Sequence, residues 1–447
     1  RAQALLRFHD LVLTHRDELM DLIVTESGKA RKHAFDEVMH VALSARYYGR
    51  MAPRLLATDR KLGAMPGLTR VEINRVPKGV VGIISPWNYP LTMALSDGLA
   101  ALAAGNGVVA KPDAQTMLSA LRGVELLEEA GVPAGLWQVV AGPGAEIGPA
   151  VTDHADYVCF TGSTQTGRSV AAACAERLIG CSLELGGKNP ILILRDADIE
   201  RAAAGAVRAA YSNAGQLCVS TERMFVADQI YDRFVDRFVA RTEAMTLGAT
   251  LDWDNDMGPL ISADQLARVE AQVADAVAHG ARVRTGGRAR PDLAPYFFEP
   301  TILEGVTPQM QCFANETFGP VISVYRFTDE AEAVARANDG EYGLNASIYS
   351  RDGRRARRLA AQIRCGSVNI NEGYAASFGS LDAPMGGMRS SGIGRRQGVE
   401  GLHRFTEAQT VATQRVLDFA PAFGLNDERY AALMTGSLRA LKRLGRP

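Results

Sequence analysis

Short apolar runs alternate with helix-length segments along most of the chain, and this alternation constrains the fold more than any other feature. The first series of runs covers residues 80–84, 108–110, 137–140 and 157–160, with helical segments such as 119–130 between most of them. Parallel strands need crossover connections of this length. The pattern therefore predicts an α/β sheet whose ligands bind at the carboxyl ends of its strands.

A second series of apolar runs follows at residues 190–194, 224–226, 321–327 and 367–370. We interpret it as a second α/β domain, with the boundary near Gly186 and Gly187, where paired glycines interrupt two apolar segments. The length of 447 residues is about three times a domain of ~150 residues, which favours at least two packed cores.

The two ends of the chain follow other patterns. Residues 1–60 repeat apolar side chains at three- and four-residue steps, as amphipathic helices do, whereas residues 68–76 alternate apolar and polar side chains like a half-buried strand. We expect residues 418–447 to form a loop and a basic helix. The chain does not begin with Met, so we also expect that a natural N-terminal segment is missing.

Charge and cysteine usage argue against several classes of partner. The 49 basic and 50 acidic residues form no long block of one sign, so nucleic acid is not an expected partner. The most apolar stretch, residues 91–110, is interrupted by Asp97 and Asn106, so no membrane span is expected. Six scattered cysteines without a CxxC pair favour a reducing cytoplasm. The seven histidines show no metal-ligand spacing, which predicts no catalytic metal.

Residues 160–167, FTGSTQTG, join an apolar run to an Ala-rich helical segment. Glycine at such a turn lets the backbone approach a phosphate, whose charge is favoured by the free N–H groups of a helix start. The spacing is not GxGxxG, so Gly162 and Gly167 could equally be turn residues. Lys111 ends the run VVAK at a strand's carboxyl end, where it could contact a ribose or phosphate, although a solvated lysine is the commoner case.

Three further segments hold groups that could perform chemistry. SPWNYP fixes the amide of Asn88 between two prolines, as an oxyanion donor requires. ELGGK places Glu184 among apolar neighbours, which would raise its pKa toward a range useful for proton transfer, although an ion-paired structural carboxylate is commoner. NAGQLCV places Cys218 after a polar turn, a better setting for an accessible thiol than those of the other five cysteines.

Taken together and in this order, SPWNYP, KPD, FTGSTQTG, ELGGK, GQLC, ETFGP and PMGGMRSSGIGR resemble the aldehyde dehydrogenase superfamily from residue 1 to about residue 414. The stretches KPDAQT, NAGQLC, LNASIY and LDAPMGGM are most similar to those of bacterial succinate-semialdehyde dehydrogenases. The resemblance implies a Rossmann-type cofactor domain, a second α/β catalytic domain, a small β oligomerisation flap and a C-terminal tail. These domains would comprise, in turn, residues 1–59 with 79–186, 187–402, 60–78 with 403–415, and 416–447.

The same resemblance implies a site and a reaction. Cys218 would be the nucleophile, attacking as a thiolate, with Glu184 as general base and Asn88 as oxyanion donor. NADP or NAD would be bound by Trp87, Lys111, Ala114, Gly144, Gly162, Ser163, Leu185, Glu316 and Phe318. An aldehyde, with succinate semialdehyde as the first expectation, would be oxidised to its acid through a thioester, and the chains would associate as a homodimer or homotetramer.

Three positions depart from the family pattern. NAD-selective relatives have Glu where this chain has Ala114, and without that carboxylate a 2′-phosphate meets no repulsion, so we expect NADP to be used at least as well as NAD. Ser96 and Ser212 stand where some succinate-semialdehyde enzymes bind the distal carboxylate with arginines. Hydroxyls can bond a carboxylate but supply no charge, so other small aliphatic aldehydes stay open as substrates.

Two other interpretations stay open. One is a phosphorylating or coenzyme A-acylating semialdehyde dehydrogenase, although relatives that transfer to coenzyme A often lack a carboxylate at the position of Glu184. The other is a scaffold that binds a dinucleotide without turnover. The presence of nucleophile, base and oxyanion donor argues against it.

Overall fold

The computed structural model describes residues 1–65, 68–415 and 418–445. It divides into two compact units: a main body, Arg1–Leu55 with Pro77–Phe405, and a small unit, Leu56–Val76 with Thr406–Pro447. Among the described residues, no helix has both the length and the apolarity to cross a membrane.

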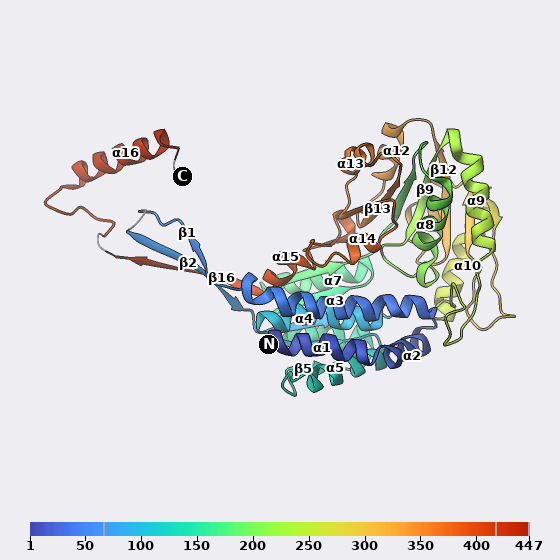
Figure 1. Ribbon diagram of the computed structural model, residues 1–447, viewed down its shortest axis with the longest axis horizontal. Coiled ribbons are helices and arrows are strands. Elements are labelled where there is room, and N and C mark those ends of the chain that lie inside the picture. Colours follow the sequence, from blue (N-terminus) through green and yellow to red (C-terminus); the bar gives the residue numbers. More distant parts are fainter. Residues whose placement is uncertain (66–67, 416–417, 446–447) are drawn as a thin grey trace. The chain divides into compact units, whose positions relative to one another are not determined.

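A six-stranded sheet forms the first half of the main body (Figure 1). Its order is β15 (Gly392–Ile393), β7 (Gly180–Glu184), β6 (Tyr157–Thr161), β3 (Val80–Ile84), β4 (Gly107–Lys111) and β5 (Trp137–Val139). All neighbours pair in parallel except β15, which is antiparallel to β7. The strand order reverses between β3 and β6, and the crevice beyond their carboxyl ends is where such sheets bind ligands.

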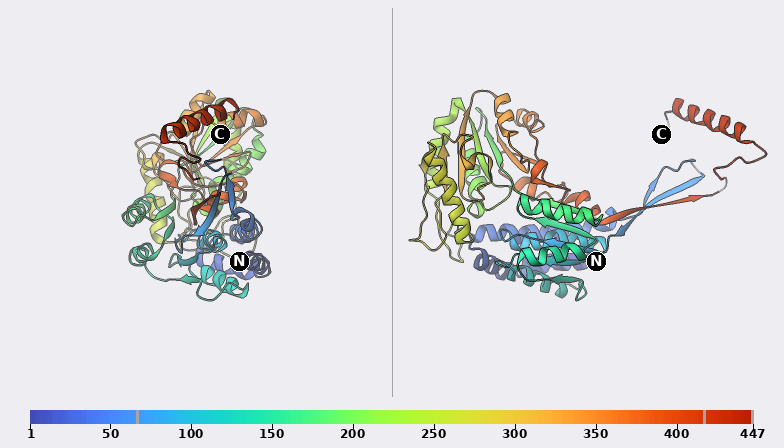
Figure 2. Two further views of the ribbon diagram at one scale, coloured as in Figure 1. Left: turned by 90° about the vertical axis from the view of Figure 1, so that its left-hand side faces the viewer. Right: turned by 180° about the vertical axis from the view of Figure 1, so that it is seen from behind.

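Helices cover both faces of this sheet (Figures 1 and 2). One face carries α4 (Pro90–Ala104) and α5 (Leu118–Glu129), and α1 (Ala2–Thr14), α2 (Arg16–Ser27) and α3 (Arg31–Leu55) pack against them. The other face carries α6 (Gly144–His154) and α7 (Thr164–Glu176), and the view from behind in Figure 2 brings the green ribbon of α7 to the front. Because α4 lies between the sheet and α3, all of its residues are buried, which explains its apolar sequence.

A seven-stranded sheet forms the other half of the main body. Its order is β10 (Arg282–Thr285), β11 (Thr301–Glu304), β12 (Val321–Phe327), β9 (Thr221–Ala227), β8 (Asn189–Ile193), β13 (Asn345–Tyr349) and β14 (Ser367–Ile370). Only β10 is antiparallel to its neighbour. Every residue of β8 and β9 is buried, as expected for parallel strands covered on both faces.

The helices of this half are mostly crossovers between its strands. The longer ones are α8 (Ile199–Tyr211), α9 (Tyr231–Glu243), α10 (Ala263–Ala278), α12 (Glu330–Ala337) and α13 (Gly353–Ala360). Shorter segments are α11 (Gln311–Ala314), α14 (Ala375–Phe378), α15 (Gly398–His403), η1 (Ser212–Gly215), η2 (Asp228–Ile230) and η3 (Arg389–Ser391).

The small unit contains a three-stranded sheet and a helix. The sheet has the order β1 (Asp59–Lys61), β2 (Thr69–Pro77) and β16 (Thr406–Gln414), and the Thr69 hydroxyl donates to Gln414 Oε1 at 2.7 Å. The helix α16 (Asp427–Arg443) begins after Asn426, whose side chain accepts from the Arg429 N–H as an N-cap. None of the side chains of α16 is buried.

The α/β class predicted from the apolar runs is confirmed. The predicted helices of residues 1–60, the strand at 68–76 and the helix of the C-terminal tail are also present. The predicted runs do not include strands β1, β7, β10, β11, β13, β15 and β16. The chain passes from one sheet to the other between the end of β7 at Glu184 and the start of β8 at Asn189.

Candidate active site

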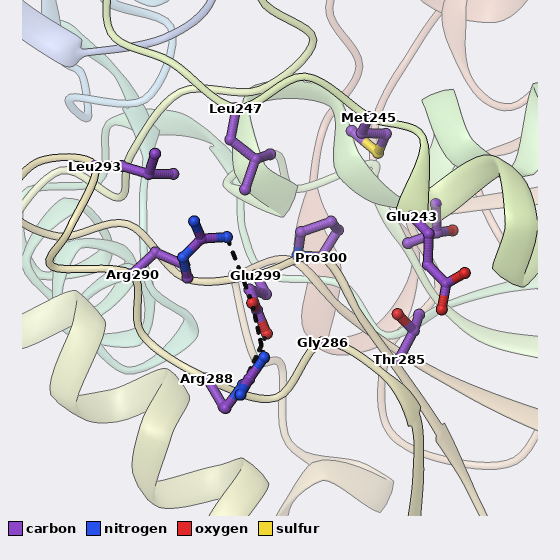
Figure 3. A pocket seen from close by; sticks show the side chains of 11 residues that line it. Glu243, Met245, Leu247, Thr285, Gly286, Arg288, Arg290, Leu293, Glu299 and Pro300 are labelled. Atoms are coloured by element: carbon purple, nitrogen blue, oxygen red, sulfur yellow. Dashed lines mark hydrogen bonds and ion pairs between the residues drawn. The ribbon is translucent and has the colours of Figure 1, made fainter.

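Two cavities of the main body differ in the reactive side chains that line them. One, of about 350 Å³, lies between the end of α9 and the loops around β10 (Figure 3). Arg288 and Arg290 in its wall both pair with Glu299, and its eleven lining residues include no cysteine or histidine. Arg290 also pairs with Asp292 at 2.7 Å, so two carboxylates match the two guanidinium groups and this cavity has little charge left to offer a substrate.

The second cavity, of about 240 Å³, brings together nine of the residues singled out from the sequence. They are Trp87, Asn88, Gly162, Ser163, Glu184, Leu185, Cys218, Glu316 and Phe318. Most of these residues lie at or just after the ends of β3, β6 and β7 in the six-stranded sheet. The others lie in the loops that lead into β9 and β12 of the seven-stranded sheet. The cavity therefore opens at the carboxyl ends of strands on either side of the switch point.

The loop that carries Cys218 is held in an unusual backbone conformation. Asn213, Ala214 and Gly215 have φ values of 52°, 54° and 70°, all in the left-handed region. A Cβ at Gly215 would lie 2.1 Å from the Gly319 carbonyl oxygen, so only glycine fits there. Strained residues of this kind persist where surrounding contacts over-determine them, often at active sites.

Hydrogen bonds fix the same loop to the seven-stranded sheet. The Asn189 amide, at the start of β8, donates to the carbonyls of Cys218 and Ser220, both at 2.7 Å. Ser220 donates in turn to the Ala209 carbonyl at 3.1 Å. The half-buried Cys218 side chain is thereby held at the cavity.

The Asn88 loop is supported from two directions. Asn88 Nδ2 donates to the Gln216 carbonyl at 3.0 Å, two residues before Cys218. The Asn88 carbonyl accepts from Lys29 Nζ at 2.6 Å and from Asn213 Nδ2 at 3.0 Å. A primary amide has two N–H groups, so the one not bonded to Gln216 can still donate to an oxyanion.

Lys29 is itself part of a buried ion pair. Its Nζ lies 2.5 Å from Glu37 Oε1, and neither side chain is exposed. Glu37 also accepts from the Thr92 N–H at 3.1 Å, and Lys29 Nζ lies 3.9 Å from the centroid of the Tyr89 ring. This pair, which the sequence did not reveal, positions the start of α4 and the loop before it.

Glu184 ends β7 with a carboxyl group that has few partners. It is 5 % exposed, and its Oε1 has no hydrogen-bond partner among the described residues. Burial raises the pKa of Glu184 to about 7, with the Arg396 guanidinium as the main opposing influence. A pKa near neutrality suits a general base, because the group is ionised in useful amount and still accepts a proton.

The Cys218 thiol differs from expectation. Burial raises its pKa to about 12, and the carboxylates of Glu184 and Glu316 act in the same direction. Burial therefore opposes the anionic sulfur predicted from the sequence, and the thiol proton must be removed before attack. Its nucleophilic attack requires a base, and Glu184 lies in the same cavity.

One side of the cavity suits a dinucleotide. Ser163 caps α7 by accepting from the Thr166 N–H at 3.2 Å, so free N–H groups of the first turn lie where a phosphate can bind. The Trp87 and Phe318 rings meet edge to face, with centroids 5.5 Å apart. Glu316 Oε1 accepts from the Gly187 N–H at 2.8 Å.

Three predicted cofactor residues lie outside this cavity, at the adjacent strand end. Lys111 is buried at the end of β4, and a Cβ at Gly144, the first residue of α6, would lie 3.7 Å from its Nζ. Ala114 is exposed three residues farther along. A buried cation beside a helix start and an exposed small residue fit the ribose and phosphate end of a dinucleotide.

The two serines predicted for substrate binding do not line the Cys218 cavity. The Ser96 hydroxyl is buried in α4 without a hydrogen-bond partner among the described residues. Ser212 donates to the Arg208 carbonyl at 2.7 Å and lines a separate cavity of about 290 Å³. The cavity wall beside Cys218 is formed instead by apolar residues and one cation, namely Tyr89, Met93, Leu217, Val219, Phe378, Met385 and Arg396.

Sequence reasoning missed Arg396 although it directly follows the PMGGMRSSGIGR segment. A second basic residue after the motif's final arginine was the available signal. Across residues 1–65, 68–415 and 418–445, no group of three or more His, Cys, Asp or Glu side chains could hold a metal ion.

Comparison with known proteins places this geometry among relatives. The model of the aldehyde dehydrogenase family matches residues 1–411. The chain is 50% identical over 444 residues to a Mycolicibacterium smegmatis protein named "Putative succinate-semialdehyde dehydrogenase [NADP(+)]", covering 99% of this chain and 86% of that one. It is 40% identical over 409 residues to a glutarate-semialdehyde dehydrogenase of Pseudomonas aeruginosa, covering 91% and 83%.

Solved structures give the same result. An NADP-dependent enzyme of E. coli superposes with a TM-score of 0.88 at 37% identity, covering 93% of this chain and 85% of that one. A betaine aldehyde dehydrogenase of Staphylococcus aureus in complex with NAD+ superposes with a TM-score of 0.89 at 34% identity, covering 95% and 84%. The predicted aldehyde dehydrogenase-like α/β fold is thereby confirmed.

Proposed function

Because the chain belongs to the aldehyde dehydrogenase family, we propose that it oxidises succinate semialdehyde to succinate, with NADP or NAD as hydride acceptor. The observation that carries the reaction type is one cavity that holds the Cys218 thiol, the Glu184 carboxyl and the Asn88 amide. The substrate rests on the names of two relatives, each of which acts on the semialdehyde of a dicarboxylic acid.

The first half-reaction forms a covalent adduct on Cys218. Glu184 takes the thiol proton, directly or through water, and the sulfur attacks the aldehyde carbon. The Asn88 amide and the Cys218 backbone N–H then stabilise the oxyanion. A nicotinamide dinucleotide held beside Trp87, Ser163 and Glu316 would supply the acceptor for the hydride that leaves the tetrahedral carbon, and the acyl group would then remain on Cys218 as a thioester.

The second half-reaction is hydrolysis. Glu184, once it has passed its proton to solvent, accepts a proton from a water molecule that attacks the thioester carbon. The C–S bond breaks, the carboxylic acid leaves and the Cys218 thiol is restored. A carboxyl group with a pKa of about 7 can perform both proton transfers near neutral pH.

A neutral aliphatic aldehyde is the second candidate substrate, and one cavity favours it. A space of about 120 Å³ shares Tyr89, Leu217, Val219 and Phe378 with the Cys218 cavity. The rest of its lining is mostly apolar, with Asp36 and His40 as its ionisable groups. Burial lowers the pKa of His40 to about 3, so this wall offers no cation to a distal carboxylate at neutral pH.

The cofactor preference follows from Ala114. A carboxylate at this exposed position would repel a 2′-phosphate, and none is present. We expect NADP to be used at least as well as NAD, and Ala114→Glu to lower kcat/KM for NADP about tenfold or more relative to NAD, a loss of roughly 1.4 kcal/mol. A parent enzyme with a strong NAD preference would contradict this.

Domain roles and assembly complete the proposal. We assign cofactor binding to residues 1–59 with 79–186, catalysis to 187–402 and association of two or four chains to the flap of 60–78 with 403–415. All six cysteines are unpaired, which suits a reducing cytoplasm. The tail, 416–447, is given no role.

One assay tests the proposal as a whole. Absorbance of reduced cofactor is followed with succinate semialdehyde, hexanal and benzaldehyde, each with NADP and NAD, for the parent and Cys218→Ala. We expect turnover of succinate semialdehyde by the parent alone. Far faster turnover of hexanal or benzaldehyde would favour the second candidate, a rate that depends on added phosphate or coenzyme A would indicate acyl transfer, and no reduced cofactor with any aldehyde would contradict the proposal.

A further inference from the structure

Arg396 is a buried cation in the wall of the Cys218 cavity. It is 3 % exposed and lines the cavity together with Glu184. A charge is costly to bury unless partners neutralise it. The partners of Arg396 therefore indicate what it does.

The counter-ion of Arg396 is shared. Asp97 of α4 is 6 % exposed, and its Oδ1 accepts from Arg396 Nε at 3.2 Å and from Arg404 Nη2 at 2.6 Å. Arg404 also donates to the Ser182 hydroxyl in β7 at 2.8 Å. Two guanidinium groups thus share one carboxylate, which leaves one positive charge in excess beside the end of β7.

Of the polar atoms of this cluster that lack hydrogen-bond partners among the described residues, two complement each other. Arg396 Nη2 has no hydrogen bond in the described part of the chain, although it lies 3.1 Å from Asp97 Oδ1, and Glu184 Oε1 has none either. The first is a donor and the second an acceptor, and both residues line one cavity. Ionised Glu184 would make the cluster of two arginines and two acids neutral.

The backbone holds Arg396 in this place. Its N–H and carbonyl bond the carbonyl and N–H of Met385 at 2.7 and 2.8 Å. Ile393, three residues before Arg396, pairs in β15 with Leu183 of β7, which is the neighbour of Glu184. Arg396 Nη1 lies 3.4 Å from Met93 Sδ in the same wall.

We propose that Arg396 is a positioning residue for thioester hydrolysis, holding the Glu184 carboxylate in its ionised form and turned toward the cavity. The inference rests on the proposed role of Glu184 as general base. Arg396 also lowers the pKa of the Cys218 thiol, but it touches neither sulfur nor aldehyde in this scheme and acts on hydrolysis through Glu184.

The charges around Glu184 fix the sign of the expected effect. Arg396, Arg404 and Arg395 favour its ionised form, in that order, and burial and Asp97 oppose it. On the other side of the cavity lie Cys218, Glu316 and the cation of Arg268, and Arg268 is not among the main influences on the pKa of Glu184. Removal of the Arg396 charge therefore raises the pKa of Glu184. Hydrolysis needs the ionised carboxylate, so as the pH is lowered the variant loses hydrolysis at a higher pH than the parent does.

The test separates the two half-reactions. Rapid mixing measures the burst of reduced cofactor, and steady-state kcat measures hydrolysis where it limits turnover, both from pH 5.5 to pH 9 on the oligomer as it is purified. For Arg396→Gln we expect a burst of parental size, a kcat about tenfold lower at pH 6, and an acid limb displaced upward by about one pH unit. Arg396→Lys, which keeps the charge, should restore most of the displacement.

Two further variants make the result specific. Arg404→Gln should displace the acid limb in the same direction by less, and Asp97→Asn should displace it downward. Should Arg396→Gln fail to fold, these two displacements of opposite sign still decide the question. An acid limb that stays in place in every folded variant, or Arg396→Lys no better than Arg396→Gln, would overturn the proposal.

A different set of results would contradict the proposed function itself. If the parent showed no burst, or Glu184→Gln hydrolysed the thioester as fast as the parent, the base itself would be misassigned. A parental burst with an unmoved acid limb in Arg396→Gln counts against Arg396 alone.

Discussion

Glu184 and Glu222 are equally buried carboxyl groups with opposite surroundings. Glu222, in β9, is 3 % exposed, and its carboxylate pairs with Lys188 and accepts from the backbone N–H groups of Thr317 and Phe318 at 2.9 to 3.1 Å. Glu184, 5 % exposed, has an oxygen with no partner at all among the described residues. Burial alone therefore does not identify a reactive acid, and the supply of hydrogen bonds does.

The comparison also separates the two kinds of work that buried acids do. Glu222 joins Lys188 after β7 to the loop that carries Phe318, and so fixes the geometry of the cofactor side of the cavity. Glu184 Oε1 has no hydrogen-bond partner among the described residues and is left available to accept a proton. The predictions below test this division.

The largest effect on turnover is expected from Cys218→Ala, because the two half-reactions assigned to this cavity both depend on the Cys218 sulfur. Without the sulfur no covalent adduct forms, and turnover should fall by at least about a thousandfold. Cofactor reduction with saturating aldehyde measures it. Cys181→Ala, which removes another half-buried thiol, is the matched control and should keep parental activity. Equal losses in the two variants would contradict the assignment.

Glu184→Gln should remove base catalysis and leave the adduct. We expect a burst of reduced cofactor of parental amplitude, formed more slowly because Glu184 also takes the thiol proton, and steady-state turnover about 10²- to 10⁴-fold lower, the usual contribution of a general base. Acid quench followed by mass measurement should find the acyl group on Cys218. Undiminished steady-state turnover would show that Glu184 does not activate the water.

Glu222→Gln should give the reverse result, a loss of stability with the chemistry retained. The change leaves Lys188 buried without its counter-ion, and breaking one partner of such a pair costs about 3–5 kcal/mol. Denaturant unfolding measures the free energy. In the fraction that stays folded, the ratio of burst to steady-state rate should match the parent's, and a selective loss of hydrolysis would erase the distinction from Glu184.

The sequence predicted the parts of this site that local pattern determines. The run VVAK is apolar because β4 is covered on both faces, so Lys111 could be placed at a strand's end. SPWNYP and NAGQLC could be recognised as loops that carry an amide and a thiol. Strand β7 escaped, since GCSLE is short and only partly apolar.

What escaped prediction depends on contacts between distant residues. Lys29 donates to the Asn88 carbonyl, 59 residues away in the sequence, and Arg396 donates to Asp97, 299 residues away. The protonated state of Cys218 follows from burial and from two carboxylates of other elements. Spacing along the chain also suggested Ser96 and Ser212 for the substrate, but Ser96 lies inside α4, Ser212 begins η1, and neither lines the Cys218 cavity.

The smallest expected effect is on stability, and there Glu184→Gln should have the opposite sign to Glu222→Gln. The folded-state pKa of Glu184, about 7, lies above the value of about 4.3 in an unfolded chain, so the folded protein binds more protons between these values. The free energy of unfolding should therefore fall as pH rises from about 4 to 7, by at most about 4 kcal/mol from this group. A neutral glutamine does not lose a proton, so Glu184→Gln should be more stable than the parent at pH 8 by about 1–3 kcal/mol, and the gain should vanish near pH 4. Denaturant unfolding of both proteins at the two pH values measures the difference. A destabilised Glu184→Gln at pH 8 would mean that this carboxylate, like Glu222, is held by partners in the fold.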